Sequence, residues 1–555
     1  MTGYEEDIME WFDGIAANAG QTQRETLRRI LETNHGVEYL NRWIGDQGDE
    51  LRNMDSEAIE SLFTSLVPLS SHADVEPYIQ RIADGDSSPI LTQQPITMLS
   101  LRIYPIRAGG RILEFIYSSK QFKTKGGLSV GTATTHYFAS EEFKSKQKST
   151  KSFTCSPPEV ISSGDYKQTT YCHLLLGFIH SDQVEFVTST FAYSIVHALS
   201  ALEDLWEELC EDMREGKLSP TRVTEASMRK AVLEDLKPNP SLASRMEERC
   251  EELKRSNWLA TVPKLWPNAK YVYSILTGSM QAYLKKLRHY SGELPLVSAD
   301  YGSTESWIGV NLDPTSPPEE VTFTIIPTFS YFEFIPLKKT STTFTTVEQI
   351  VAHDLIEAEP LPISRVKVGE QYEVVLTTFT GQYRLGDVVE VAGFYKGTPQ
   401  LNFICRRKLI LAVNIDKSTE KDLQLVVEKG SQVLSRSKAE VVDFTSHANV
   451  VEHPGHYIIY WEIKGEVEES VLGECCREMD LSFLDHGYVL SRKCNSIGPL
   501  ELRVVDRGTF KKILDYFIAN GAAMSQYKMP RCTTNQVLLR ILDACTVKRF
   551  LSTAY

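Results

Sequence analysis

The spacing of hydrophobic and polar positions changes near residue 112. Residues 1 to about 85 carry apolar side chains at helical spacing, among them Ile8 and Trp11. From Ile112 onward, short β-branched and aromatic clusters such as Ile112 to Tyr117 alternate with long amphipathic stretches such as Ala192 to Met213. The pattern predicts a helical lead-in followed by βα units around a mostly parallel sheet.

A charged segment in the middle of the chain has the spacing of a surface helix. Arg229 to Arg255 contains Leu and Met at helical intervals between charged residues. We expect it to form a helical outer layer over the sheet.

The last 140 or so residues show a tighter alternation of strand and helix patterns. We expect strands at Tyr457 to Ile463 and Leu500 to Val505, followed by helices at Glu468 to Leu484 and Thr509 to Asn520. Thr509 is the expected N-cap of the last of these helices. Two such units indicate a small α+β domain.

The change of pattern also places the domain boundary. We expect an α/β protein in which residues 1–404 form a large N-terminal domain, with β-sheets flanked by helices. Residues 405–422 form a hinge, and residues 423–555 form the small α+β C-terminal domain.

Composition and charge narrow the class of protein. The 555 residues are 42% hydrophobic and 24% charged, which excludes disorder, collagen and coiled coil as global descriptions. The formal net charge of −14 repels polyanions as a whole, so a nucleic-acid or anionic-membrane partner is disfavoured.

The cysteines and the N-terminus point to an intracellular protein. The ten cysteines include no C-x-x-C pair, and no His stands at zinc-finger spacing, so they are interpreted as reduced thiols. Three acids near the N-terminus do not fit a secretory signal, and no run of about 18 apolar residues occurs. We expect a soluble, cytoplasmic monomer with no membrane partner.

The first candidate for chemistry is Tyr301-Gly302-Ser303-Thr304-Glu305, which follows the apolar run Leu294 to Val297. A strand that ends in Gly and two hydroxyls can bring N–H and O–H donors to a phosphate, and the Glu can hold the accompanying metal ion. A hydroxyl-rich surface turn is the alternative.

The second candidate is Arg384-Leu385-Gly386-Asp387. The Asp387 carboxylate offers two acceptor oxygens, which suits the two hydroxyls of a ribose. A salt-bridged turn is the alternative for this segment alone. Nucleotide sites in open α/β sheets form beyond strand ends, so the two segments together favour a nucleotide site.

The third candidate is Asn414-Ile415-Asp416-Lys417, near the basic run Arg406 to Lys408, and a further lysine, Lys528, lies in a loop before the final helix. A lysine is a compact charge that can neutralise a phosphate in a transition state. A solvated basic patch remains the alternative.

Together these segments resemble the plant acyl acid amido synthetases of the Gretchen Hagen type, in the adenylate-forming ligase superfamily. The resemblance rests on the three candidate segments and on Gln526-Tyr527-Lys528, and it runs from about residue 8 to the C-terminus. The chain looks most like the jasmonate-conjugating branch, through Phe403 to Arg407 and Ser491 to Cys494.

The resemblance implies a ligase with a mobile C-terminal domain that uses ATP and Mg²⁺. ATP and a carboxylic acid would give an acyl adenylate, and an amino acid amine would then form the amide. The implied acid is jasmonate, with auxin (indole-3-acetic acid) as the alternative, and the implied amino acid is isoleucine.

The same resemblance assigns roles to individual residues. It assigns the nucleotide to Ser100, Gly302, Ser303, Thr304, Glu305, Asp387 and Lys417, and Mg²⁺ to Glu305. It assigns the acyl acid to Thr134, Thr135, Ala299 and Trp307, and the amino acid to Gly131. It gives catalytic roles to Lys417, Glu305 and Lys528.

One departure from the family pattern puts the activity in question. Family members carry a Ser-Ser-Gly-Thr-rich loop and a helix after the segment that matches Thr97 to Ser100. Here Leu101 and Arg102 follow Ser100 at once, so that some tens of residues are missing. The alternative function is a catalytically impaired member that still binds nucleotide or acid.

Overall fold

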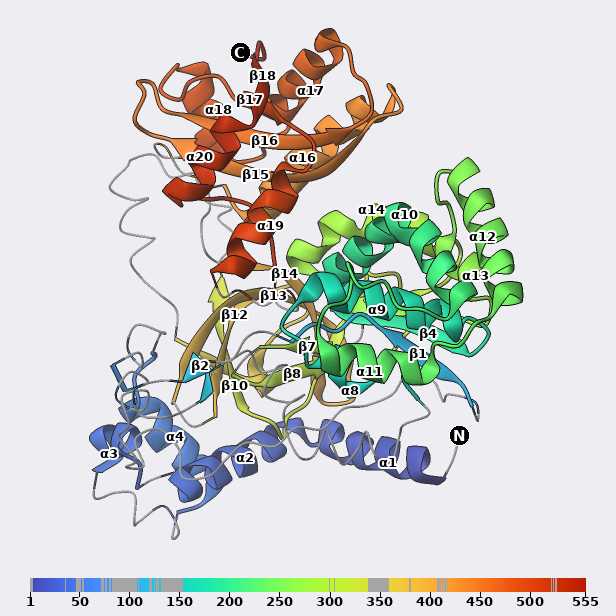
Figure 1. Cartoon of the computed structure of the whole chain (residues 1–555). Helices are drawn as coiled ribbons and strands as arrows, with labels where there is room; N and C mark the ends of the chain where they lie inside the picture. The colour runs from blue at the N-terminus through green and yellow to red at the C-terminus, as the bar shows by residue number, and fades with distance from the viewer. Residues whose placement is uncertain are drawn as a thin grey trace. The chain divides into compact units, whose positions relative to one another are not determined.

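The fold is that of a computed structural model of the chain (Figure 1). The structure describes residues 3–34, 36–45, 51, 54–70, 74, 77–78, 81, 107, 109–118, 122–123, 125, 129–130, 153–298, 300–303, 305–337, 359–378, 381–406, 411, 413, 416, 418–520, 522, 524 and 527–555. It divides into two compact units. The first comprises Met1–Thr277 and Tyr283–Ile404, and the second comprises Gly278–Ala282 and Cys405–Tyr555.

The predicted helical lead-in is confirmed by four helices, α1 (Gly3–Ala17), α2 (Ala19–Asn34), α3 (Glu38–Ile44) and α4 (Ser56–Leu66). Leu27 and Leu31 of α2, four residues apart, pack with Ile59 and Phe63 of α4 in one apolar cluster. The side chain of Gln23 joins α2 to the turn at residues 327–330, because its amide donates to Pro327 O and Ser330 O, both at 2.6 Å.

The predicted parallel sheet is present in the first unit. It contains β1 (Arg111–Glu114), β4 (Val184–Phe191), β5 (Val272–Ile275) and β6 (Leu296–Ser298), in the order β1-β4-β5-β6 with every pair parallel. The helices of this region are α8 (Pro158–Ile161), α9 (Tyr166–Ile179), α10 (Ala192–Glu215), α11 (Ala226–Asp235), α12 (Pro240–Arg255), α13 (Thr261–Leu265) and α14 (Leu284–Ser291). The 3₁₀ turn η2 (Gly278–Tyr283) is assigned, except for Tyr283, to the second unit.

The charged segment from Arg229 to Arg255 is helical, as expected, and consists of two helices. The expected segment from Arg229 to Arg255 is divided between α11 and α12. Asn239 caps α12 by accepting a hydrogen bond from Leu242 N at 3.0 Å, and Pro240 occupies the first helical position. Pro238 and Pro240 therefore explain the break.

A second sheet of the first unit corrects the expectation of a mostly parallel architecture. It contains β7 (Asp300–Gly302), β8 (Trp307–Val310), β9 (Phe323–Ile325), β10 (Tyr331–Leu337), β11 (Leu361–Pro362), β12 (Gln371–Thr377), β13 (Tyr383–Tyr395) and β14 (Thr398–Arg406). The order is β11-β10-β12-β13-β14-β9-β8-β7, and the pairs with a described register are antiparallel. The short elements are η3 (Ile363–Arg365) and the pair β2 (Phe122–Lys123) and β3 (Ser129–Val130).

The second unit is the small α+β domain expected from the sequence. Its sheet contains β15 (Glu440–Asn449), β16 (His456–Lys464), β17 (Glu501–Val505) and β18 (Thr546–Leu551), in that order. Its helices are α16 (Glu420–Ser435), α17 (Glu469–Leu481), α18 (His486–Lys493), α19 (Thr509–Ala519) and α20 (Gln536–Ala544). The role of residues 405–422 as a hinge stays a prediction.

One cap was placed wrongly. The N-cap of α19 is Gly508, with φ at 82°, and Thr509 is the first helical residue. The two carboxylate oxygens of Glu462 accept from Gly508 N at 2.8 Å and from Phe510 N at 2.9 Å. The Glu462 side chain of β16 thus accepts the N-terminal N–H bonds of α19 that Thr509 was expected to accept.

Two further expectations concern the cysteines and membrane-spanning helices. All ten cysteines are free thiols, as expected. Over the described ranges, no helix has both the length and the apolar character needed to cross a bilayer.

Candidate functional site

The candidate site begins where the parallel sheet of the first unit ends. The edge strand β6 stops at Ser298 and β7 starts at Asp300, so the chain passes directly from the carboxyl end of the parallel sheet into the antiparallel one. Ligands of α/β proteins bind at such strand ends. The Tyr273 hydroxyl of β5 donates to Asp300 Oδ2 at 3.1 Å, and burial raises the pKa of Asp300 to about 6.

The β7–β8 turn carries the predicted phosphate-binding segment. Ser303 N donates to Ser306 O at 2.9 Å, and Ser306 N donates to Ser303 Oγ at 3.2 Å. Gly302 faces the indole of Trp307 in the paired strand, and a Cβ at position 302 would lie 3.1 Å from that ring. The glycine therefore lets Trp307 lie flat against the backbone.

Asp387 lies on β13 and is only 3% exposed. Gly386 precedes it with φ at +77°, a conformation that favours glycine. The Tyr301 hydroxyl donates to Asp387 Oδ2 at 2.8 Å. This hydrogen bond joins the first predicted segment to the second.

The Tyr301–Asp387 hydrogen bond also indicates that the antiparallel sheet is strongly curved. β7 and β13 are four strands apart in the order, which in a flat sheet is about 19 Å at the usual strand spacing. A tyrosine side chain cannot span that distance. The sheet must curl so that its two arms converge, and the Tyr301 ring packs on Phe323 of β9 and Phe403 of β14 inside the curl.

The arginine of the Arg-Leu-Gly-Asp segment has a structural partner. Its guanidinium forms a two-pronged pair with Glu373 of β12, with Nε to Oε1 at 3.0 Å and Nη2 to Oε2 at 2.5 Å. Glu373 is buried, so Arg384 compensates a charge inside the sheet.

Glu305 is half-buried in the β7–β8 turn, and in the described part of the chain it forms no hydrogen bond or ion pair. The same residues contain no group of three His, Cys, Asp or Glu side chains placed to hold a metal ion. Mg²⁺ is often held by one or two carboxylates together with phosphate oxygens and water. A lone Glu305 beside a nucleotide fits that donor set.

The structure places some of the predicted residues together and leaves others untested. Gly302, Ser303, Glu305, Trp307 and Asp387 belong to one curled sheet of the first unit. Lys528 is exposed in the second unit, between α19 and α20. The positions outside the described residues are Ser100, Gly131, Thr134, Thr135, Ala299, Thr304 and Lys417.

The neighbours of Lys417 are firmly anchored. Val413 N donates to both oxygens of Asp416, at 3.1 and 2.9 Å, and the Tyr457 hydroxyl of β16 also donates to Asp416. Ser418 pairs with Leu411 through two backbone hydrogen bonds. Asp416 is therefore tied to β16 of the second unit through Tyr457, and the position of Lys417 itself lies outside the described residues.

Sequence reasoning missed two contributors to the site. Tyr301 orients Asp387, a role that the motif alone does not indicate; the available signal was a tyrosine immediately before Gly302, close after an apolar run. Tyr273 lies 27 residues before its partner Asp300, and no local pattern links the two.

Comparison with protein families matches most of the chain. Residues 8–102 and 100–296 match the GH3 family N-terminal domain in two segments, residues 323–406 match the GH3 family central domain, and residues 421–537 match the GH3 family C-terminal domain.

Similar proteins cover the chain from end to end. "Indole-3-acetic acid-amido synthetase GH3.10" of Arabidopsis thaliana is 59% identical, over 99% of this chain and 98% of the relative. "Jasmonoyl--L-amino acid synthetase JAR4" of Nicotiana attenuata is 49% identical with the same coverage. The alignment with the Arabidopsis relative has 588 positions against the 555 residues here, so at least 33 of those positions have no counterpart in this chain.

A solved structure confirms the fold class. The "GH3.15 acyl acid amido synthetase" matches with a TM-score of 0.84 and 33% identity, over 99% of this chain and 97% of the other. The three domain matches, the relatives and this structure agree, and the chain belongs to the GH3 family.

Proposed function

We propose that this chain is an ATP-dependent acyl acid amido synthetase, which joins a small carboxylic acid to an amino acid through an acyl adenylate. The observation that carries the proposal is the hydrogen bond from Tyr301 to Asp387. It brings the expected phosphate segment and the expected ribose carboxylate to one place in the first unit. The names of the relatives at 59% and 49% identity support the amide-forming reaction.

Each described residue has a part in this scheme. Asp387 would accept the ribose hydroxyls, held in orientation by Tyr301. Ser303 N and Oγ both donate to Ser306 O, so the turn would exchange these bonds to donate to the α-phosphate. Glu305 would hold Mg²⁺, which when bound neutralises phosphate charge during adenylation. Trp307, packed on Gly302, would form a wall for the acid. Lys417 and Lys528 would supply positive charge from the second unit.

A pyrophosphate-release assay tests the proposal. We expect release from ATP that depends on the added acid, and a loss of at least a hundredfold in Asp387→Asn and in Glu305→Gln. Glu320→Gln, an exposed glutamate of the same unit, is the matched control and should keep wild-type activity. Equal rates in all four proteins would refute the assignment of the site.

Jasmonate is the acid we propose first, because Phe403 to Arg407 and Ser491 to Cys494 resemble the jasmonate-conjugating branch. Indole-3-acetic acid is the second candidate, favoured by the name of the 59% identical relative. Parallel measurements of kcat/KM with the two acids, each with isoleucine as the amine, decide between them. A tenfold preference for indole-3-acetic acid would overturn the first choice.

A second candidate function is a member that binds nucleotide or acid without efficient turnover. The specific observation is the gap: the two N-terminal family matches meet at residues 100–102, and at least 33 positions of the Arabidopsis relative are missing. If the missing positions include the phosphate loop that the resemblance implies after Ser100, adenylation loses donors worth about 2.7–4 kcal/mol each.

The same assay separates the two candidates when it is paired with equilibrium binding of ATP. Retained ATP binding without pyrophosphate release supports the impaired member. Release at rates that depend on the acid supports the enzyme. Insertion of the relative's missing segment after Ser100 should restore release in the first case, and its failure to do so would contradict the role given to the gap.

A further inference from the structure

A small charged slot lies between α2 and the first turn of α4, and none of its lining residues is assigned to the ligase reaction. Its volume is about 370 Å³, near the lower end of the range for small-molecule sites. The lining residues are Gln21, Arg24, Arg28, Asp55, Ser56 and Glu57. We call it the α2–α4 slot.

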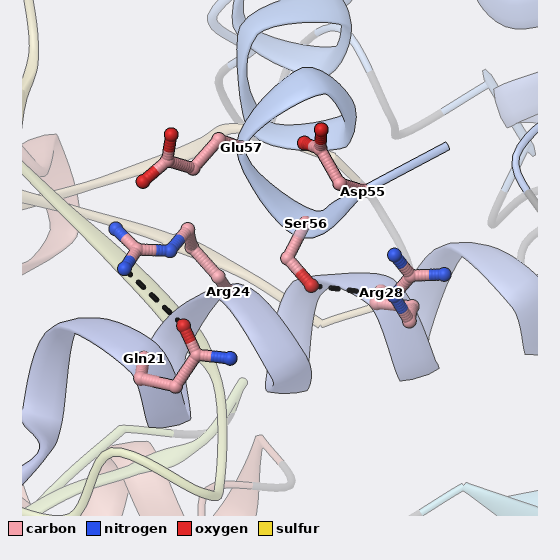
Figure 2. A pocket seen from close by; sticks show the side chains of 6 residues that line it. All are labelled: Gln21, Arg24, Arg28, Asp55, Ser56 and Glu57. Carbon is pink, nitrogen blue, oxygen red and sulfur yellow. Dashed lines mark hydrogen bonds between the residues drawn. The ribbon is translucent and has the colours of Figure 1, made fainter.

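The two cations of the α2–α4 slot, Arg24 and Arg28, come from α2, and the two anions, Asp55 and Glu57, come from the start of α4. Figure 2 shows the guanidinium of Arg24 facing the Glu57 carboxylate, the guanidinium of Arg28 on the side of Asp55, and Ser56 between them. Among the described residues no ion pair joins either arginine to Asp55 or Glu57, and Arg28 pairs instead with Glu32 of its own helix at 3.5 Å. Two cations and two anions therefore face each other across a gap that their own side chains do not close.

The slot is largely organised without an occupant. Arg28 Nη2 donates to Met54 O at 2.5 Å and its Nε donates to Ser56 Oγ at 3.4 Å. Asp55 Oδ1 accepts from Ala58 N at 2.8 Å as the N-cap of α4. These bonds hold one cation and one anion in place, and ordered binding groups lower the cost of binding.

Arg24 is the cation of the slot whose hydrogen bonding is less complete. Its Nη2 donates to Gln21 Oε1 at 3.3 Å, within the same helix. Its Nε is buried and has no hydrogen-bond partner. A buried donor left without a partner is unfavourable, so the arginine gains from any acceptor that reorients it.

The mixture of charges selects the ligand. A simple anion attracted by the arginines would meet Asp55 and Glu57, and a simple cation attracted by the acids would meet the arginines. A molecule that carries both charges satisfies both sides, because guanidinium suits a carboxylate and carboxylates suit an ammonium. We propose that the α2–α4 slot binds a free α-amino acid as a zwitterion, with its carboxylate on Arg24 and Arg28 and its ammonium at Asp55 and Glu57.

Such a site would be distinct from the amino acid site of the proposed ligase reaction, and it does not rest on that reaction. Titration calorimetry of the full chain without ATP or acid tests it, with L-alanine as the probe. Propionate, which lacks the ammonium, and ethylamine, which lacks the carboxylate, are the comparison ligands. We expect both to bind at least tenfold more weakly than alanine.

Variants on each side of the slot complete the test. Arg24→Gln and Glu57→Gln should each weaken alanine binding at least tenfold, whereas Glu320→Gln, the exposed glutamate outside the slot, should bind as the wild type does. Equal thermal unfolding of the four proteins confirms that the variants fold. Alanine binding that is absent from the wild type, unchanged in both variants or matched by propionate would overturn the proposal. A protein that binds alanine in this manner but forms no amide would refute only the ligase proposal.

Discussion

The hydrogen bond between Tyr301 and Asp387 gives the sharpest test of the nucleotide site. Tyr301→Phe removes one hydroxyl and leaves the aromatic packing on Phe323 and Phe403 in place. A hydrogen bond to a charged group contributes about 1.5–3 kcal/mol. Asp387 is buried, so the variant leaves a carboxylate oxygen without this donor, and the carboxylate is free to turn away from a ribose.

The expected loss can be converted into an affinity. If one bond between Asp387 and a ribose hydroxyl is lost with the orientation, 1.5–3 kcal/mol corresponds to a roughly 10- to 150-fold weaker binding of AMP. Isothermal titration with AMP measures this directly and does not depend on turnover.

Tyr331→Phe is the matched control for this experiment. The Tyr331 hydroxyl of β10 donates to Glu60 Oε1 at 2.9 Å, so this variant also removes a buried tyrosine bond to a carboxylate in the same unit. Both variants should lower the thermal stability by similar amounts. AMP affinity that is unchanged in Tyr301→Phe, or lowered equally in both, would refute the reasoning.

Three further predictions concern the surrounding structure. Burial and the nearby Glu60 raise the pKa of Glu333 from 4.5 to about 8, so the folded state keeps a proton that the unfolded state loses. As the pH rises between these two values, the free energy of unfolding should fall by about 1.4 kcal/mol per pH unit. Urea titrations at several pH values should show this slope, and Glu333→Gln should flatten it. Gly302→Ala places a Cβ 3.1 Å from Trp307, and this overpacking should lower the free energy of unfolding by about 1–3 kcal/mol. The variant should also raise the KM for the acid. An unchanged KM would show that Trp307 does not line the acid site. Thr419→Ala removes the capping box with Asp422 at the start of α16 and should cost about 1 kcal/mol, seen as a lower melting temperature of the second unit.

Much of the fold was readable from local periodicity. The strands and helices of the second unit, the parallel sheet and α10 follow patterns of period two or 3.6, which depend only on neighbouring residues. The break between α11 and α12 could also be predicted from the sequence, because Pro238 and Pro240 cannot lie inside a continuous helix without breaking or kinking it. The cap of α19 was not, because its acceptor, Glu462, comes from a different strand.

The sequence by itself determined which residue types could bind a nucleotide and that Ser303 follows the end of a strand. It was wrong to expect Asp387 at a strand end, because β13 begins at Tyr383 and Asp387 lies inside it. Only the tertiary structure decided that Tyr301 reaches Asp387, 86 residues away, and that Tyr331 reaches Glu60 across 271 residues. Local periodicity says which face of a strand is apolar, but strand order and curl decide which faces meet. For this reason the antiparallel sheet and the paired motifs inside it could not be derived from spacing alone.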